Sequence, residues 1–122
     1  MPLSPLAPAR FPDLPAIGGV RVATAEAGVR YAGRTDVMLA LLAPGTAVAG
    51  AFTRSRTRSA PVRDCEAKVG GPSEGPAAIL VNSGNSNAFT GRAGEAAAER
   101  LCARAAEALG VPPRACSPPP PA

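Results

Sequence analysis

The chain has 122 residues, which allows one domain at most or a part of a larger one. It contains no tryptophan, one tyrosine and three phenylalanines, so its core must depend mainly on Val, Leu and Ile. The net charge of +4 comes from 12 arginines and one lysine, and the densest basic stretch, residues 54–58, has no interleaved aromatic side chains for base stacking. These features argue against a nucleic-acid interface and favour a solvated segment or a site for an anionic metabolite.

The cysteines and the missing histidines exclude several kinds of site. Cys65, Cys102 and Cys116 are widely spaced, and the chain has no histidine. This pattern argues against a zinc site and a disulfide framework, and it excludes a Ser-His or Cys-His nucleophile pair within the chain. Residues 1–15 are rich in proline and have no long apolar stretch, which argues against a signal peptide or a membrane span. We therefore expect a cytoplasmic protein without a membrane partner.

The first half of the chain predicts an arm followed by strands. Five prolines between positions 2 and 15 keep the arm, residues 1–19, extended. Apolar runs then predict three strands, at residues 20–25, 36–42 and 46–53. The Ala43-Pro44-Gly45 turn joins the last two strands, which we expect to pair as an antiparallel hairpin.

The second half begins with a short helix and a strand. Residues 60–69 predict the helix, with Cys65 on its inner side. Residues 77–81 form an apolar run that predicts a strand buried on both faces.

The clearest element is a helix at residues 92–109. Its inner stripe is predicted from a repeat at helical spacing, Ala97, Leu101, Ala105 and Leu109. Cys102 lies beside this stripe and is expected to be packed rather than reactive. Gly110 and Pro112 supply the stop. Residues 117–122 form a polyproline tail, which does not continue a domain.

A segment rich in Asn, Ser and Gly, residues 81–91, connects the predicted strand to this helix. Its donors at a helix N-terminus suit an anion, because unpaired N–H groups and the helix dipole point outward there. Two structural interpretations are favoured over anion binding: Thr90 as an N-cap and Gly91 as a turn residue. The asparagines are likewise expected to form turns and brace the loop rather than to bind a ligand, namely Asn82, Asn85 and Asn87.

Two further segments have a structural and a functional interpretation. Asp36, after Arg34-Thr35, is expected to be a charge at a strand end rather than a general base. Residues 53–58 are expected to be a solvated connector, although they could lie near substrate carboxylates in a complete enzyme.

Five motifs occur along the chain: Gly19-Val-Arg-Val-Ala-Thr-Ala-Glu-Ala-Gly28, Gly33-Arg-Thr-Asp-Val-Met-Leu-Ala40, Val48-Ala-Gly-Ala-Phe-Thr53, Ser59-Ala-Pro-Val62 and the Asn-rich loop that ends at Thr90-Gly91. In this order they resemble the N-terminal part of the ArgJ family, the bifunctional glutamate N-acetyltransferase / ornithine acetyltransferase of arginine biosynthesis. The resemblance runs from about Ser4 to Ser117. Each motif alone would be a weak signal.

The resemblance implies an α/β enzyme made as a precursor that cleaves itself into two chains. The N-terminal threonine of the second chain would be the nucleophile, taking acetyl from N-acetylornithine and passing it to glutamate, or taking it from acetyl-CoA as a substrate. No metal or bound organic cofactor is implied. The implied partners are the small-molecule substrates and the C-terminal (beta) chain, in a heterotetramer of two alpha and two beta chains.

The chain departs from the family pattern near its end. The family continues with a Cys-Ser-Thr-Gly segment, whose Thr hydroxyl and Gly N–H form the oxyanion hole. Here Cys116-Ser117 is followed by Pro118 and Pro119, which offer neither donor. The role is not carried over to Thr90-Gly91, and the nucleophilic threonine would fall beyond the matched segment. No catalytic, cofactor-binding or metal-binding residue is therefore expected in this chain.

The resulting expectation is a partial α/β layered domain, with a mixed sheet packed by helices. We divide the chain into an extended arm at 1–19, an ArgJ-like part at 20–117 and an aberrant polyproline tail at 118–122. The expected function is acetyl transfer as an N-terminal fragment that is inactive alone. Two alternatives remain, a non-catalytic anion or phosphate-binding module and a protein that binds a partner through its proline tail.

Overall fold

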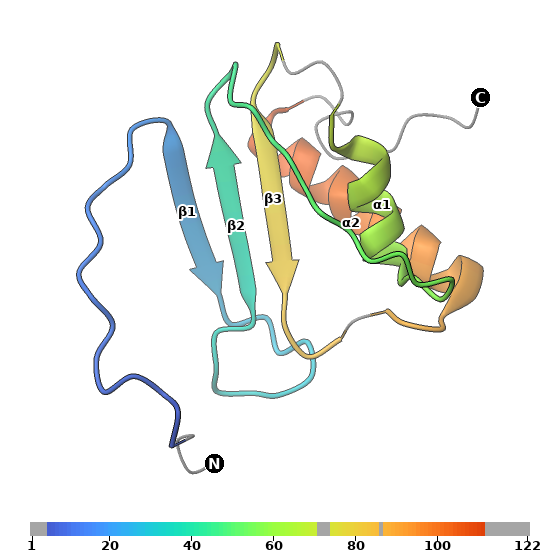
Figure 1. Ribbon diagram of the computed structural model, residues 1–122, viewed down its shortest axis with the longest axis horizontal. Helices are drawn as coiled ribbons and strands as arrows, with labels where there is room; N and C mark the ends of the chain where they lie inside the picture. The colour runs from blue at the N-terminus through green and yellow to red at the C-terminus, as the bar shows by residue number, and fades with distance from the viewer. Residues whose placement is uncertain (1–4, 71–73, 86, 112–122) are drawn as a thin grey trace.

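A computed structural model describes residues 5–70, 74–85 and 87–111. It has five regular elements in the order β1 (Val20–Ala25), β2 (Val37–Leu42), α1 (Ala60–Lys68), β3 (Ala77–Asn82) and α2 (Gly91–Leu109) (Figure 1). The strands form one sheet in the order β1-β2-β3, and both pairings are antiparallel. The expected α/β layered fold is confirmed, but the sheet of the described residues is antiparallel throughout rather than mixed. The prolines of the tail lie outside the described residues.

The helices cover only part of the sheet. α2 contacts β3, and α1 contacts α2. In Figure 1 both helices lie near β3, with α2 passing behind the sheet, whereas β1 lies at the opposite edge without a helix over it. The segment between β2 and α1 crosses in front of β3. The sheet is therefore covered at one edge and open at the other.

The strand expected at residues 46–53 is wrong, and so is the hairpin. This segment contains no strand. The hairpin is absent because β2 is the central strand, and β1 and β3 occupy both of its hydrogen-bonding edges. Residues 46–53 instead connect the sheet to α1, and within them the Phe52 ring lies so close to Gly50 that a Cβ there would be 2.7 Å from Cζ of Phe52.

The core of the described residues is thin. Its buried apolar residues are mostly small, namely Ala40, Leu42, Ala60, Ala106 and Val111. No large side chain in the described part of the chain is less than 2% exposed. The expectation that β3 is buried on both faces is wrong, since Ile79 and Val81 are 44% and 46% exposed on the side that the helices do not cover.

The helix α1 begins at the residue that the sequence predicts, Ala60. It has a proline in its first turn, where the missing N–H costs no helical hydrogen bond. Cys65 is exposed, so its expected place on the inner side is wrong.

The helix α2 packs through the expected face, but its most buried stripe lies one position beside the expected one. Its buried or half-buried positions at spacing four are Gly94, Ala98, Cys102 and Ala106. Three members of the expected stripe are half-buried as well, namely Ala97, Ala105 and Leu109. Leu101 is 49% exposed, so the expected stripe is wrong at this one position. The helix is rich in alanine, so small apolar residues occur on several of its faces. The face with the smallest residues packs against α1 and β3.

The end of α2 is as predicted. Gly110 adopts the left-handed conformation, with φ of +63°, and its N–H donates to the last turn. The Val111 N–H donates to the Ala106 carbonyl at 3.0 Å, and the Val111 side chain is buried. This is the Schellman arrangement, in which a left-handed glycine is followed by an apolar contact.

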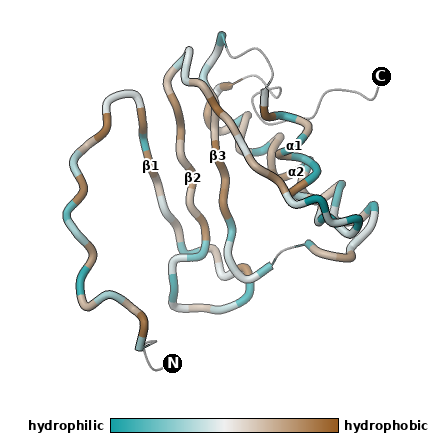
Figure 2. The backbone as a smooth tube through the Cα atoms, viewed as in Figure 1, coloured by the Kyte–Doolittle hydropathy of each residue, from teal (hydrophilic) through white to brown (hydrophobic). Residues whose placement is uncertain are grey.

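The arm lacks helix and strand over its described residues and is exposed. Its large apolar side chains are 67–92% exposed, namely Leu6, Phe11, Leu14 and Ile17. In Figure 2 the arm alternates between apolar and polar colouring and runs apart from the sheet.

Candidate functional site

The Asn-rich loop after β3 is held by its own amides. The Asn82 side-chain amide donates to the Asn85 carbonyl at 3.0 Å, and the Asn87 N–H donates to Oδ1 of Asn85, also at 3.0 Å. These bonds agree with the interpretation of the three asparagines as turn formers and braces. Asn87 and Phe89 have φ of 48° and 58°, in the left-handed region. The loop therefore turns back toward the start of α2.

Thr90 occupies the N-cap position of α2 without capping it through its side chain. Its hydroxyl donates to the Asn87 carbonyl at 2.8 Å and makes no hydrogen bond to the first turn of the helix. The position predicted for Thr90 is correct, and the capping bond is wrong, because the turn at Asn87 presents a carbonyl to the hydroxyl. Gly91 has φ of +54°, in agreement with its predicted role as a turn residue.

Gly94 makes this turn possible. A Cβ at this position would lie 1.8 Å from Oγ1 of Thr90 and 2.8 Å from its Cβ. The side chain of Thr90 therefore fills the space beside Gly94, and any larger residue there must displace it.

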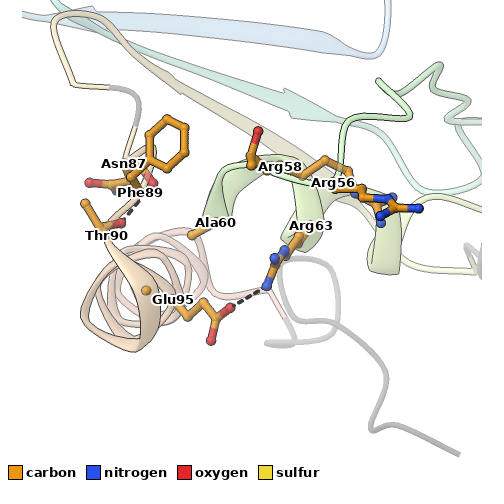
Figure 3. Close-up of a pocket in the computed structure, with 10 residues that line it drawn as sticks. Arg56, Arg58, Ala60, Arg63, Asn87, Phe89, Thr90 and Glu95 are labelled. Atoms are coloured by element: carbon orange, nitrogen blue, oxygen red, sulfur yellow. Dashed lines mark hydrogen bonds and ion pairs between the residues drawn. The ribbon is translucent and has the colours of Figure 1, made fainter.

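A cavity of about 310 Å³ lies between this loop and the start of α1. Figure 3 shows side chains from both sides of it. Its lining combines the loop and the first turns of α2 with the basic segment before and within α1, namely Arg56, Thr57, Arg58, Ala60, Arg63, Asn87, Phe89, Thr90, Gly91 and Glu95. The structure thus joins the Asn-rich loop to the basic segment, two features that the sequence presents separately.

Two arginines of the cavity are already paired. Arg58 Nη1 lies 2.7 Å from Oε2 of Glu66, and Arg63 Nη1 lies 3.1 Å from Oε1 of Glu95. In Figure 3 Arg63 points toward Glu95, and the side chain of Arg56 points away from Thr90. The guanidinium groups of Arg58 and Arg63 are therefore each neutralised by a carboxylate.

The segment before Arg58 is exposed, and hydrogen bonds from backbone N–H groups to nearby hydroxyls shape it. The Ser55 N–H donates to Oγ1 of Thr53 at 3.2 Å, and the Thr57 N–H donates to Oγ of Ser55 at 3.1 Å. Thr53 and Ser55 are exposed. This agrees with a solvated connector that reaches the cavity only at its last residues.

Asp36, expected to be a plain strand-end charge, is a buried anchor with 5% exposure. Its carboxylate accepts the N–H groups of Ala27 at 2.7 Å and Val29 at 2.6 Å. Its backbone carbonyl accepts the Ser83 N–H at 2.8 Å. The bonds from Ala27 and Val29 hold the pKa of this carboxyl below its ordinary value, because they stabilise the ionised form. Sequence spacing gave no signal for this role beyond the position of Asp36 at the start of β2.

The loop before Asp36 also contacts the Asn-rich loop. Arg34 Nη2 donates to Oγ of Ser83 at 2.8 Å. A Cβ on Gly84 would lie 3.0 Å from Cβ of Arg30. The guanidinium groups of Arg30 and Arg34 lie 5.5 and 5.4 Å from the centroid of the Tyr31 ring, within the range of cation–π contacts.

A small polar cluster joins α1 to α2. Lys68 forms an ion pair with Asp64 one turn before it, and its Nζ lies 3.3 Å from Sγ of Cys102. Burial raises the pKa of the Cys102 thiol, and the Lys68 ammonium only partly offsets this. Cys102 therefore acts as a packed residue, as expected. Over the described ranges, no three His, Cys, Asp or Glu side chains form a group that could hold a metal ion.

Comparisons with known proteins identify the family. The profile of the ArgJ family matches residues 21–118. The arginine biosynthesis bifunctional protein ArgJ of Ruegeria pomeroyi is 67% identical over 110 residues, which make up 90% of this chain and 27% of the relative. The ArgJ protein of Nitrobacter winogradskyi is 57% identical over 110 residues, 88% of this chain and 26% of its own length.

The fold agrees with the sequence match. The crystal structure of the arginine biosynthesis bifunctional protein argJ of Bacillus halodurans superimposes with a TM-score of 0.72 at 26% identity, covering 82% of this chain and 51% of that one. The architecture is thus that of an α/β layered domain shared with a biosynthetic enzyme. The chain belongs to the ArgJ family, and it spans about a quarter of the length of the curated relatives it matches. None of the helices in the described ranges has the length and apolar character needed to cross a membrane.

Proposed function

We propose that this chain is the N-terminal scaffold of an ArgJ acetyltransferase. The complete enzyme would transfer acetyl from N-acetylornithine to glutamate, and acetyl-CoA would be a further donor. The observation that carries this proposal is the family match over residues 21–118, together with 67% identity to an ArgJ protein. No resident cofactor is part of the proposal, and its place is the cytoplasm.

The chemistry explains why the chain should be inactive alone. Acyl transfer passes through a tetrahedral oxyanion, and loss of one preorganised donor costs about 2.7–4 kcal/mol in barrier height. By resemblance these donors belong at positions 118 and 119, where the chain has two prolines. Cys102 is no substitute nucleophile, since burial raises the pKa of its thiol and its neighbour Lys68 is ion-paired with Asp64.

The proposal includes a second polypeptide. The ArgJ resemblance implies a precursor that cleaves itself and supplies a threonine nucleophile whose own amine serves as the base. The C-terminal (beta) chain would bring this threonine, in a heterotetramer of two alpha and two beta chains. The thin core of the described residues supports a chain that depends on such a partner.

The test is an acetyl-transfer assay with N-acetylornithine and glutamate. The isolated chain is expected to give no turnover, and the Pro118→Thr/Pro119→Gly variant alone is expected to give none either. Turnover should appear when that variant is co-expressed with the part of the Ruegeria pomeroyi ArgJ protein that this chain does not match. Turnover by the unmodified isolated chain would contradict the proposal.

A second candidate function is an anion-binding module. The observation in its favour is the cavity shared by the Asn-rich loop, the uncapped start of α2 and the basic segment. It predicts saturable binding of inorganic phosphate or CoA by the isolated chain, measured by titration calorimetry. A Thr90→Pro substitution would serve as the test variant, and binding that is unaffected by it would exclude this cavity as the site.

A further inference from the structure

The loop between β1 and β2 carries two arginines that share one aromatic ring. The guanidinium carbons of Arg30 and Arg34 lie 5.5 and 5.4 Å from the centroid of the Tyr31 ring. We call these two residues the arginine pair. Both are exposed, and Tyr31 is 48% exposed. Because both guanidinium groups contact the same ring, their two positive charges belong to one small patch of the surface.

These charges have no carboxylate partner in the described ranges. Elsewhere in those ranges arginines form ion pairs with nearby glutamates, whereas Arg30 and Arg34 form no ion pair. Glu26, on the same loop, accepts the Gly33 N–H instead. The charge of Arg34 favours the ionised form of Asp36, but both carboxylate oxygens of Asp36 accept backbone N–H groups. Exposed cations that are gathered in this way attract anions.

The backbone that carries the arginine pair is fixed from within its loop. The carboxylate of Asp36 accepts the N–H groups of Ala27 and Val29 at 2.7 and 2.6 Å. The Gly33 N–H donates to Oε1 of Glu26 at 2.5 Å. These bonds tie the first part of the loop to its last part. Cations on a preorganised loop lose less conformational entropy when a ligand binds.

The start of the Asn-rich loop lies against the arginine pair. Nη2 of Arg34 donates to Oγ of Ser83 at 2.8 Å, and the exposed Ser83 hydroxyl keeps its own proton to donate. A Cβ on Gly84 would lie 3.0 Å from Cβ of Arg30, so the absence of a side chain there allows the close approach. In Figure 1 the loop between β1 and β2 lies beside the end of β3. The patch therefore combines two guanidinium groups with a hydroxyl, all of which are donors.

We propose that the arginine pair is a binding site for a small ligand that carries two or more phosphate groups. A planar guanidinium group binds phosphate oxygens through two parallel hydrogen bonds, and two such groups match a ligand with more than one phosphate. A nucleic acid is disfavoured, because the Tyr31 ring already contacts both guanidinium groups and is not free to stack on a base. The inference goes beyond the proposed function, which assigns no role to these residues.

The test is titration calorimetry of the purified chain at low salt. Inorganic pyrophosphate is expected to bind saturably, one to one and at least fivefold more tightly than inorganic phosphate. ADP and CoA are titrated in parallel. Equal affinity for pyrophosphate and ADP would assign recognition to the phosphates, and tighter binding of ADP or CoA would identify a nucleotide as the ligand; both results support the proposal.

Variants assign the binding to the arginine pair. Arg30→Gln and Arg34→Gln are each expected to weaken pyrophosphate binding at least fivefold. The matched control is Arg100→Gln, which removes an exposed arginine from α2 and is expected to change the Kd less than twofold. Tyr31 acts as a positioning residue, so Tyr31→Leu should weaken binding about threefold, whereas Tyr31→Phe keeps the ring and should restore the affinity to within twofold of the wild type.

Folding of each variant is checked by circular dichroism, and the titrations are repeated on the chain co-expressed with the part of the Ruegeria pomeroyi ArgJ protein that it does not match. Absence of saturable binding in both preparations would overturn the proposal, and so would an equal loss with Arg100→Gln. Loss with Arg56→Gln but not with Arg30→Gln would also overturn it, because Arg56 lines the cavity beside α2 and the binding would belong there. Tighter binding of a single-stranded oligonucleotide than of pyrophosphate would do the same, since it would identify a nucleic-acid site.

Discussion

Asp36 ties the loop before β2 to the residues that follow β3. Its carboxylate fixes Ala27 and Val29, and its backbone carbonyl fixes Ser83. The sequence predicted a charge at a strand end, which is correct for its position. The burial of Asp36 and its bonds to Ala27, Val29 and Ser83 depend on the path of the loop before β2. No local sequence pattern predicts that path.

The lowered pKa of Asp36 has a definite consequence for stability. A carboxyl whose pKa is lower in the folded state stabilises the fold above its unfolded pKa, near 3.8, and this contribution is lost as the pH falls through the lower folded-state pKa. Asp36→Asn removes the charge, so we expect a lower urea midpoint at pH 7 and a smaller further loss between pH 5 and pH 2. Urea unfolding followed by circular dichroism checks this.

The control for that experiment is Asp13→Asn. Asp13 is fully exposed on the arm, in a distant pair with Arg10 at 3.9 Å, so this variant should follow the wild-type pH profile. Identical pH profiles for Asp36→Asn and the wild type would contradict the anchoring role.

Gly94 allows a second prediction at the level of a single residue. Gly94→Ala would place a Cβ against Oγ1 of Thr90 and break its bond to the Asn87 carbonyl. Although alanine favours helix, we expect a net loss of about 1–3 kcal/mol in the free energy of unfolding, as is usual for overpacking. Gly75→Ala is the matched control, because nothing lies within 4 Å of its Cβ position, and it should change stability by less than about 0.5 kcal/mol. Equal effects of the two substitutions in urea unfolding would refute this account.

At the level of elements, local patterns predicted β1, β2, β3, α1 and α2 within one or two residues. The false strand at 46–53 has apolar residues like the true ones, and its expected pairing with β2 is impossible because both edges of β2 are occupied. The predicted stripe of α2 is wrong only at Leu101, because alanine occurs on most faces of this helix and the pattern does not single out its most buried stripe. The ion pair between Arg63 and Glu95 spans 32 residues, so sequence reading had no means to bring the basic segment to the Asn-rich loop.

The observed stripe of α2 predicts where the helix tolerates bulk. Ala106 is 1% exposed, so Ala106→Leu should overpack the contact and cost about 1–3 kcal/mol. Ala103→Leu introduces the same side chain on the exposed side of α2 and should change stability by no more than about 0.5 kcal/mol. Thermal or urea unfolding distinguishes them, and an equal cost for both would place the packed face of α2 elsewhere.

At the level of the whole molecule, the described residues form a layer that is not closed. Small residues dominate the core, and large apolar side chains stay accessible on the sheet and the arm. Family membership could be predicted from ordered motifs in the sequence, and the comparisons confirm it. The sequence could not show which side of the sheet stays uncovered, because that depends on where the connector and the helices cross it.

The incomplete core predicts a stability that depends on a partner. A binder that recognises only the folded state raises stability by about 2.7 kcal/mol when present at 100 times its Kd. We therefore expect the unmatched part of the Ruegeria pomeroyi ArgJ protein to raise the urea midpoint of this chain. The increase should grow with the concentration of that part. An unrelated protein at equal concentration should have no effect, and an unchanged midpoint with the ArgJ part would contradict the dependence.

The outer strand β1 has a practical consequence. Among the described strands it pairs with β2 alone, five of its six residues are exposed, and Arg21 is its single charge. Strands of this type act as templates for one another, because their free N–H and C=O groups add a neighbouring chain as readily as an internal one. Concentrated solutions of the isolated chain should therefore tend to self-assemble into ladder-like aggregates, and a lysine in place of Ala23 would be the simplest way to keep such samples dispersed.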